Sequence, residues 1–470
     1  MNGEIKSTAL KDEMINLFQS NQSLLMKNTF PGLSVLRRGA IEKFRETGFP
    51  DNKMEAWKNT DLSEALARPY DHHLQPITPE ENIQHIFRCH IPNLNTTTLA
   101  QYNGWFVTSG LPLLKSPEGI ITGSLSAAME QYQGLFGQYF GKIADPNAGG
   151  FDSLNAAFAQ DGIFIFIPDN TIVTKPFQIV NAIRHKKNIF IQSRNLIILG
   201  KNSSITLVHC EDSFNEQPSF TNVTSEIVIG ENASLDHYKL QNLNNDSSLV
   251  NSTWFRLSAG SRLSANSVML NGGLIRNNTC VKLEGRGAHA EVFGLYLMDK
   301  HQHIDNHIFV DHASPDCTSS ELFKGILDEH ASGVFNGHVL VRRDSQRTNA
   351  YQSNKNILLT DTARINTKPF LEIYADDVKC SHGATVGQLD AESMFYLRSR
   401  GIGEDSARML LLYAFADEII SHISIPALRV RIEDMVKKRL RGELSVCDQC
   451  VLHCSHPDKP VEFEIDLSKI

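Results

Sequence analysis

The sequence predicts a mainly β protein, with a β-solenoid core between helical N- and C-terminal regions. From residue 162 to about 388, short apolar runs alternate with polar turns and helical periodicity is absent. One turn pattern recurs every thirty residues, as LGKNSSI at 199–205, IGENASL at 229–235 and AGSRLSA at 259–265. Looser copies start at Gly285, Asp328 and Asp361. A fixed period of this kind indicates stacked coils that share one core. A large antiparallel sandwich is the alternative.

The composition is that of an ordinary globular protein with two or three structural units, at 470 residues, 41% hydrophobic and 21% charged. The net charge of −8 argues against a nucleic-acid partner, because such binding depends on cationic contacts to phosphate. Asp12 and Glu13 interrupt the apolar part of the first 30 residues, so we expect no signal peptide. No apolar run reaches the length of a membrane span. Eight cysteines then indicate reduced thiols in a cytoplasmic protein.

Residues 1–160 form the N-terminal region, which is helical and then mixed. The spacing of its apolar residues predicts one helix over 13–29 and a second that Ser34 caps and Gly48 ends. Trp57 follows among charged residues. We interpret it as an amphipathic anchor against the body, with a binding surface as the alternative.

The later part of this region predicts short elements joined by loops. Residues 136–158 suggest a helix interrupted by Pro and Gly turns. The chain contains neither a phosphate loop nor a dinucleotide fingerprint.

Residues 161–387 make up the predicted solenoid, and IFIFI at 163–167 is its first clear strand. A solenoid has two open ends, whose strand edges pair with other chains unless something covers them. The flanking helical regions are candidates to cover these ends. Alternatively, an end or a side of the solenoid pairs with a second solenoid.

Residues 388–442 predict a C-terminal region of three amphipathic helices. Asp390 is the expected N-cap of the first helix, and Glu404 or Asp405 starts the second. Pro426 suits the first turn of the third. Such helices can form a cap on the solenoid or a docking module.

Residues 443–470 form a Cys-rich tail. Three thiols, Cys447, Cys450 and Cys454, lie within the ten-residue run CDQCVLHCSH. The spacing Cys-x2-Cys-x3-Cys can bring soft ligands onto one metal ion or cluster, although a second ligand pair is lacking. The alternative is a mobile tail with reactive thiols.

A histidine-rich run, HQHIDNH at 301–307, is a second candidate metal site. If it is a strand, His301, His303, Asp305 and His307 share one face and offer nitrogen and oxygen ligands. A polar ladder on the solvent face of a coil is the favoured interpretation.

The stretch ADDVKCSHGAT at 375–385 joins the solenoid to the helical region. In an extended segment, Cys380 and His382 point to the same face. A thiol and an imidazole so placed are candidate ligands of a metal or cluster. The alternative is a buried thiol and a hydrogen-bonded imidazole that shape the bend between the two regions.

Four stretches carry a resemblance to the SufB/SufD family of the SUF iron–sulfur cluster assembly system. They are KMEAWKNTDL at 53–62, NKNILL at 354–359, TKPFLEI at 367–373 and ADDVKCSHGAT at 375–385. The last is the most specific. Within that family, the tryptophan motif and the form of the 375–385 stretch resemble the SufD branch.

The resemblance implies a right-handed parallel β-helix that pairs with SufB, and helices near 391–441 that dock the ATPase SufC. The chain would then be a non-catalytic scaffold. Whether it forms a homodimer when alone is left open by the sequence. His382 would be a ligand of a nascent, transient iron–sulfur cluster shared with SufB, with Cys380 beside it. A reduced flavin is implied for the assembled complex. The tail thiols lie outside the shared family core, so their role is not carried over.

Two functions of other classes compete with this one. One is a β-helix carbohydrate-active enzyme, which needs a carboxylate pair that the sequence does not present at useful spacing. The other is a purely structural β-helix adaptor.

Overall fold

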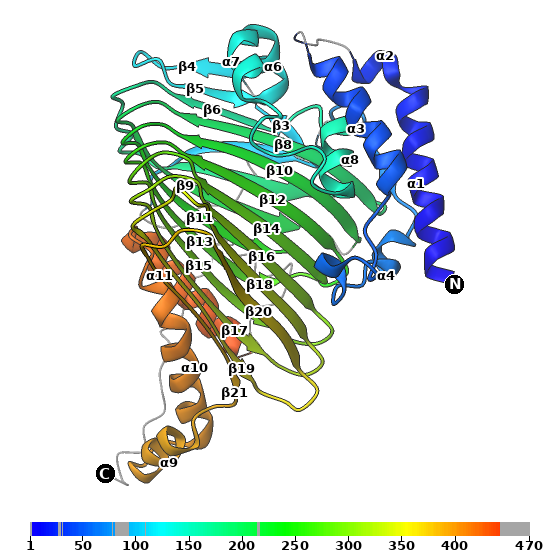
Figure 1. Ribbon diagram of the computed structural model, residues 1–470. Coiled ribbons are helices and arrows are strands. Elements are labelled where there is room, and N and C mark those ends of the chain that lie inside the picture. The colour runs from blue at the N-terminus through cyan, green and yellow to red at the C-terminus, as the bar shows by residue number, and fades with distance from the viewer. Residues whose placement is uncertain are drawn as a thin grey trace.

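The computed structural model describes residues 2–26, 30, 32–77, 79, 94–108, 110–213 and 217–441. Two long sheets face each other and form a flattened parallel β-solenoid, with helices at both ends of the chain (Figure 1). Successive strands alternate between the sheets, so that each coil contributes one strand to each. The strand pairs β8–β9 to β20–β21 make about seven coils. The predicted solenoid is confirmed.

Neighbouring coils pair in parallel, which excludes the antiparallel sandwich. Antiparallel pairing among the described strands is confined to β2–β3, β4–β5 and β5–β6. Sheet A contains β4 (Leu113–Lys115), β5 (Ile121–Ser124), β6 (Ile163–Ile167), β8 (Ile189–Leu199), β10 (Ser219–Ile229), β12 (Ser248–Leu257), β14 (Leu274–Leu283), β16 (His303–His312), β18 (Ser332–Val341) and β20 (Arg364–Ile373), with β1 (Asp71–His72) beside β8. Sheet B contains β2 (Thr97–Tyr102), β3 (Trp105–Val107), β7 (Phe177–Ile183), β9 (Ser204–Ser213), β11 (Ser234–Asn242), β13 (Arg262–Asn271), β15 (His289–Met298), β17 (Thr318–Leu327), β19 (Thr348–Leu358) and β21 (Val378–Gly387).

The repeated turn lies where the chain passes from sheet A to sheet B. At seven of these turns, up to the one between β18 and β19, one residue adopts a left-handed backbone conformation, which Asn, Asp and Gly accept most readily. These residues are Asn170, Asn202, Asn232, Gly260, Gly287, Asp316 and Arg347. The Asn202 side chain donates to Asn170 Oδ1 at 2.8 Å, and Asn232 donates to Asn202 Oδ1 at 3.2 Å. This asparagine ladder links successive coils and explains the thirty-residue pattern.

Two of the predicted looser repeats belong to the opposite edge. Asp328 and Asp361 follow β17 and β19, so they lie where the chain returns from sheet B to sheet A. Gly285 does follow a sheet A strand, β14. The sequence pattern does not distinguish the turns at the two edges of the solenoid, because both kinds of turn are short, polar and contain Gly, Asp or Asn.

The core lies between the two sheets, where inward side chains stack coil upon coil. One row in sheet A shows the principle, because its members pair in register and are at most 2% exposed. The row consists of Ile197, Ile227, Phe255, Val281, Val310 and Val339. Burial of such side chains is the main stabilising contribution in a solenoid.

The N-terminal region packs on the outer face of sheet A (Figure 1). It contains α1 (Asn2–Ser20), α2 (Gln22–Leu25), α3 (Leu33–Thr47), the 3-10 turn η1 (Glu55–Trp57), α4 (Ser63–Leu66), α6 (Leu125–Gln131), α7 (Gln133–Tyr139) and α8 (Gly150–Phe158). The predicted limits 13–29 were wrong, because α1 begins at Asn2 and a turn at Asn21 separates it from α2. Ser34 is not the cap of α3 either, since Gly32 holds that position, although the helix does end at Gly48.

The C-terminal region contains α9 (Ala391–Ser399), α10 (Glu404–Ile420) and α11 (Pro426–Leu440). Asp390 caps α9 as predicted, accepting a hydrogen bond from the Ser393 backbone N–H at 2.9 Å. Pro426 occupies the first turn of α11. None of the described helices combines the length and apolarity that crossing a membrane requires.

Helices α10 and α11 cover the outer face of sheet B. The Arg439 guanidinium donates to the Leu270 carbonyl at 2.8 Å, and Asn266 donates to the Ile419 carbonyl at 3.1 Å. Apolar residues of β9, β11, β13 and β15 form one buried cluster with both helices. The tail helices therefore bind across several coils rather than capping the end of the solenoid.

Candidate functional site

The last coil of the solenoid is open. β20 and β21 end the two sheets, so within the described residues their outer edges have no strand partner. Ile373 and Val386, at the ends of these strands, are 39% and 47% exposed, and Tyr374 is 58% exposed. Unpaired strand edges beside an uncovered apolar core are a surface onto which another sheet can continue.

Cys380 and His382 lie on the inner face of this coil, as predicted. In the register of β19 and β21, Cys380 pairs with Ala350 and His382 with Gln352. Ala350 belongs to the core, and the Gln352 side chain reaches across it to Gly337 of sheet A, where a Cβ would lie 2.2 Å from Gln352 Nε2. Cys380 is consequently half-buried against the core. His382 is exposed, because among the described residues no further coil stacks on it.

The Cys380 thiol is held in its protonated form. Burial raises the pKa of this thiol, and the backbone N–H of Ala350 opposes the rise only in part. The thiolate is the form that binds iron, so a metal must displace the proton on binding.

A polar row leads from the interior of the solenoid to His382. Glu321 pairs with Gln352, which pairs with His382, at spacings of thirty-one and thirty residues. Gln352 Nε2 donates to Glu321 Oε2 at 2.8 Å, and both side chains are buried. Burial raises the pKa of Glu321 to about 8. The sequence analysis missed this row, and the coil spacing is the signal that could have revealed it.

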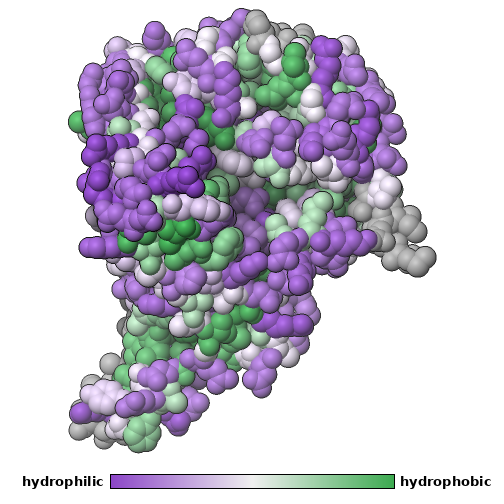
Figure 2. Space-filling model, viewed as in Figure 1, coloured by the Kyte–Doolittle hydropathy of each residue, from purple (hydrophilic) through white to green (hydrophobic). Residues whose placement is uncertain are grey.

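Helix α9 is the exposed part of the C-terminal region. It projects beyond the solenoid in Figure 1, and each of its residues is at least partly exposed. Phe395 and Tyr396 are 73% and 57% exposed. Figure 2 shows hydrophobic residues on the neighbouring surface, where α10 lies on the last coils. Exposed aromatic side chains beside apolar surface are typical of protein–protein contacts.

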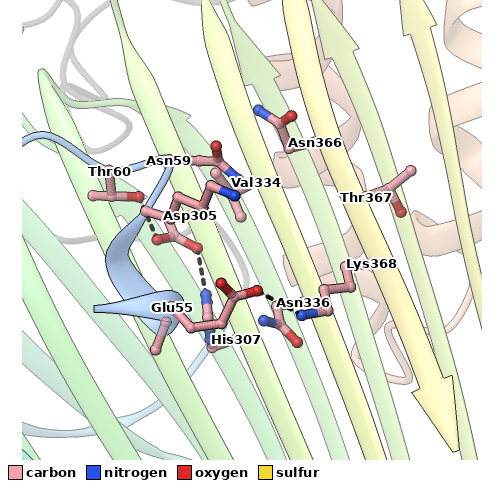
Figure 3. A pocket seen from close by; sticks show the side chains of 12 residues that line it. Glu55, Asn59, Thr60, Asp305, His307, Val334, Asn336, Asn366, Thr367 and Lys368 are labelled. Atoms are coloured by element: carbon pink, nitrogen blue, oxygen red, sulfur yellow. Dashed lines mark hydrogen bonds and ion pairs between the residues drawn. The ribbon is translucent and has the colours of Figure 1, made fainter. Parts of the chain in front are cut away.

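A separate pocket lies between η1 and sheet A (Figure 3). It has a volume of about 310 Å³ and is lined by Thr60, Asp305, His307 and an ion pair at 2.8 Å between Lys368 and Glu55. A larger cavity of about 690 Å³ adjoins it beneath Trp57.

The buried negative charge of Asp305 in this pocket is balanced by the positive charge of Arg276. Arg276 forms an ion pair with Asp305 and lies over the Trp57 ring, 4.2 Å from its centroid. Burial would raise the pKa of Asp305, but Arg276 and hydrogen bonds from His307 and Thr60 outweigh it and hold the pKa well below its ordinary range. These contacts fix η1 to the solenoid, which agrees with the anchor interpretation of Trp57.

The arrangement at 301–307 fits neither the alternative metal site nor the favoured ladder on a solvent face, because Asp305 is buried. His301 lies in the turn before β16 and stacks on His330, with ring centroids 5.0 Å apart, so it does not share a face with the others. Asp305 is already paired with the Arg276 guanidinium, whose fixed positive charge opposes a metal ion there. The tail thiols Cys447, Cys450 and Cys454 lie outside the described residues.

Two family models match nearly all of the described chain. The SufBD protein N-terminal region matches residues 8–179, and the SufBD core domain of SUF system FeS cluster assembly matches residues 182–415. The chain is 33% identical to an iron–sulfur cluster assembly SufBD family protein of Synechocystis, an alignment that covers 86% of this chain and 90% of that one. It is 28% identical to the iron–sulfur cluster assembly protein SufD of Escherichia coli, over 86% and 92% of the two chains. A chloroplastic protein of Arabidopsis thaliana is 30% identical over 86% of each. The chain therefore belongs to the SufBD family of the SUF iron–sulfur cluster assembly system.

Proposed function

We propose that this chain is a non-catalytic scaffold subunit of the SUF complex, in the role of SufD. In this role it pairs with SufB through the open coil and docks the ATPase SufC through α9 and the adjoining helices. The observation that carries the proposal is the open terminal coil with Cys380 and His382 on its inner face. Family membership supports the link to cluster assembly.

The two unpaired strand edges support the proposed pairing with SufB. A second solenoid that adds its own terminal strands to β20 and β21 would continue both sheets and bury Ile373 and Val386. In the absence of SufB, a second copy of this chain can occupy the same surface, which accounts for the proposed homodimer.

We propose the same junction as the site of the nascent cluster. His382 supplies an exposed imidazole and Cys380 a protonated thiol, while SufB supplies the remaining ligands. An incomplete ligand set on each subunit suits a cluster that has to be released. A movement of the partners would make or break the site, which gives SufC a mechanical route to control it. A reduced flavin belongs to the assembled complex in this proposal, without assigned residues here.

The first test is the His382→Ala variant, co-expressed anaerobically with SufB and SufC. We expect the three chains to co-purify, with iron and acid-labile sulfide reduced at least about twofold, because loss of a ligand weakens metal affinity about tenfold or more. Ser381→Ala, on the outer face of the same strand, is the control and should leave the content unchanged. Unchanged iron and sulfide in His382→Ala would refute the ligand role. Loss of the complex would instead make His382 a pairing residue.

The second test addresses the docking of SufC. We expect Phe395→Ala combined with Tyr396→Ala to weaken SufC binding at least about tenfold, because exposed aromatic anchors dominate such interfaces. Val430→Ala on α11, where the valine is 63% exposed, is the matched control. Binding can be measured by calorimetry with purified SufC. Equal affinity for the double variant and the control would exclude α9 as the docking site.

A further inference from the structure

The segment that leads from the N-terminal helices into the first coil and the β7–β8 loop together carry a group of three ligating side chains. β1 pairs with β8, which places Asp71 beside Ile189 and brings the segment next to the β7–β8 loop. The Asp71 backbone N–H donates to the Asn188 carbonyl at 2.8 Å, and the Asn188 side chain donates to the Pro69 carbonyl at 3.0 Å. The backbone on both sides is thus fixed before any metal binds.

Three side chains converge here, namely Asp71, His73 and His185. One donor atom from each lies within 4.8 Å of the other two, and all three residues are partly buried. The Nε2 atoms of His73 and His185 are 3.1 Å apart, with ring planes inclined by 62°. Two imidazole nitrogens on one tetrahedral Zn²⁺ lie about 3.3 Å apart, given Zn–N distances near 2.0–2.1 Å. The observed separation is within a few tenths of an ångström of that value.

The far side of the His185 ring is also suited to metal binding. His185 Nδ1 lies 3.1 Å from the Lys187 carbonyl oxygen and 3.2 Å from the Lys187 backbone nitrogen. In the metal-free form, Nδ1 can accept from that N–H. When Nε2 binds a metal, Nδ1 carries the proton and can donate to the carbonyl, the arrangement that usually orients a ligating histidine.

The Lys187 ammonium competes with a metal ion for the Asp71 carboxylate, but it can move away. Lys187 Nζ lies 3.4 Å from the Asp71 carboxylate, but the Lys187 side chain is 74% exposed and can move into solvent. This distinguishes the group from Asp305, whose partner Arg276 is buried and fixed.

We infer that Asp71, His73 and His185 form a binding site for one Zn²⁺ ion, with solvent in the fourth position. Two nitrogens and one carboxylate oxygen are a ligand set that this ion accepts. The bound ion would join the N-terminal region to the β7–β8 loop. The site lies at the β8 end of the solenoid, far from β21 (Figure 1), and does not depend on the proposed cluster site.

The test is a Zn²⁺ titration of the full-length chain carrying Cys447→Ser, Cys450→Ser and Cys454→Ser, so that tail thiols do not compete. We expect one Zn²⁺ to bind. His73→Gln or His185→Gln should weaken this binding at least about tenfold, and Lys187→Met should leave it equal or tighter. The double variant His301→Gln, His330→Gln removes two stacked histidines elsewhere and should bind as the parent does.

A second set of measurements, made on the parent protein, tests the site independently of whether the histidine variants fold. Co²⁺ added to the parent should give visible absorption bands of a nitrogen–oxygen site, without sulfur charge-transfer bands. Zn²⁺ should also raise the unfolding temperature of the parent, but not that of His73→Gln. Absence of the Co²⁺ bands, or equal Zn²⁺ affinity in the parent and both histidine variants, would overturn the inference.

Discussion

Replacement of Arg194 by methionine is expected to lower the free energy of unfolding by about 3–5 kcal/mol. Arg194 on β8 and Glu226 on β10 form an ion pair at 2.7 Å, with side chains 1% and 0% exposed. Glu226 also accepts backbone N–H bonds from Gly141, Ile143 and Ala144, and so holds the segment after α7 against sheet A. Without Arg194, the Glu226 carboxylate remains buried with its charge unbalanced, which is the costly outcome.

Urea denaturation followed by circular dichroism measures this effect. Arg262→Met is the control, because Arg262 is an exposed strand residue and its loss should change stability by no more than about 0.5 kcal/mol. The double variant Arg194→Met, Glu226→Gln removes both charges and should recover part of the loss. A loss below about 1 kcal/mol for Arg194→Met would show that the backbone donors alone stabilise Glu226.

Glu321→Gln is expected to remove a pH dependence of stability that the native chain shows between pH 5 and 8. Burial raises the pKa of Glu321 to about 8, above its ordinary value of 4.5. In this pH range the folded chain keeps a proton that the unfolded chain releases, so the stabilisation is complete below about pH 4.5 and is lost as the pH rises towards 8. The slope is about 1.4 kcal/mol per pH unit, or about 4 kcal/mol over three units.

The measurement is the difference in unfolding free energy between Glu321→Gln and the native chain at pH 5 and at pH 8. The unfolding free energy of the variant should rise relative to that of the native chain as the pH rises. The reason is that an amide at position 321 keeps the Gln352 contact without ionising. Glu392→Gln on exposed α9 controls for the loss of a carboxylate. Its unfolding free energy should differ from that of the native chain by the same amount at pH 5 and at pH 8. A flat difference for Glu321→Gln would mean that Glu321 is ionised in the folded chain at neutral pH.

The fold was predictable because its determinants are local. Asn202 and Asn232 recur at the one turn position that requires a left-handed backbone, and Asp390 and Pro426 mark helix starts through contacts within one turn. The limits of α1 were harder to place, because its hydrophobic face continues across the turn at Asn21 into α2.

The sites were predictable only where their residues are close in sequence. Cys380 and His382 share a face because strand side chains alternate, and this holds in any extended segment. By contrast, Glu321 meets Gln352 only through the register of two coils, and Asp71 meets His185 only through the pairing of β1 with β8. The sequence could not show for the same reason that His301 lies outside the strand, since the turn that removes it is set by coil stacking.

The position of the tail helices has a consequence for synthesis of the chain. Sheet B is complete through β15 by residue 298, whereas α10 and α11, which cover its outer face, are made more than a hundred residues later. Until then Tyr238, Val268 and Phe293 form part of an uncovered apolar stripe. Chains that stop before α10 should therefore aggregate or be held by chaperones, even though every coil beneath the stripe is already present.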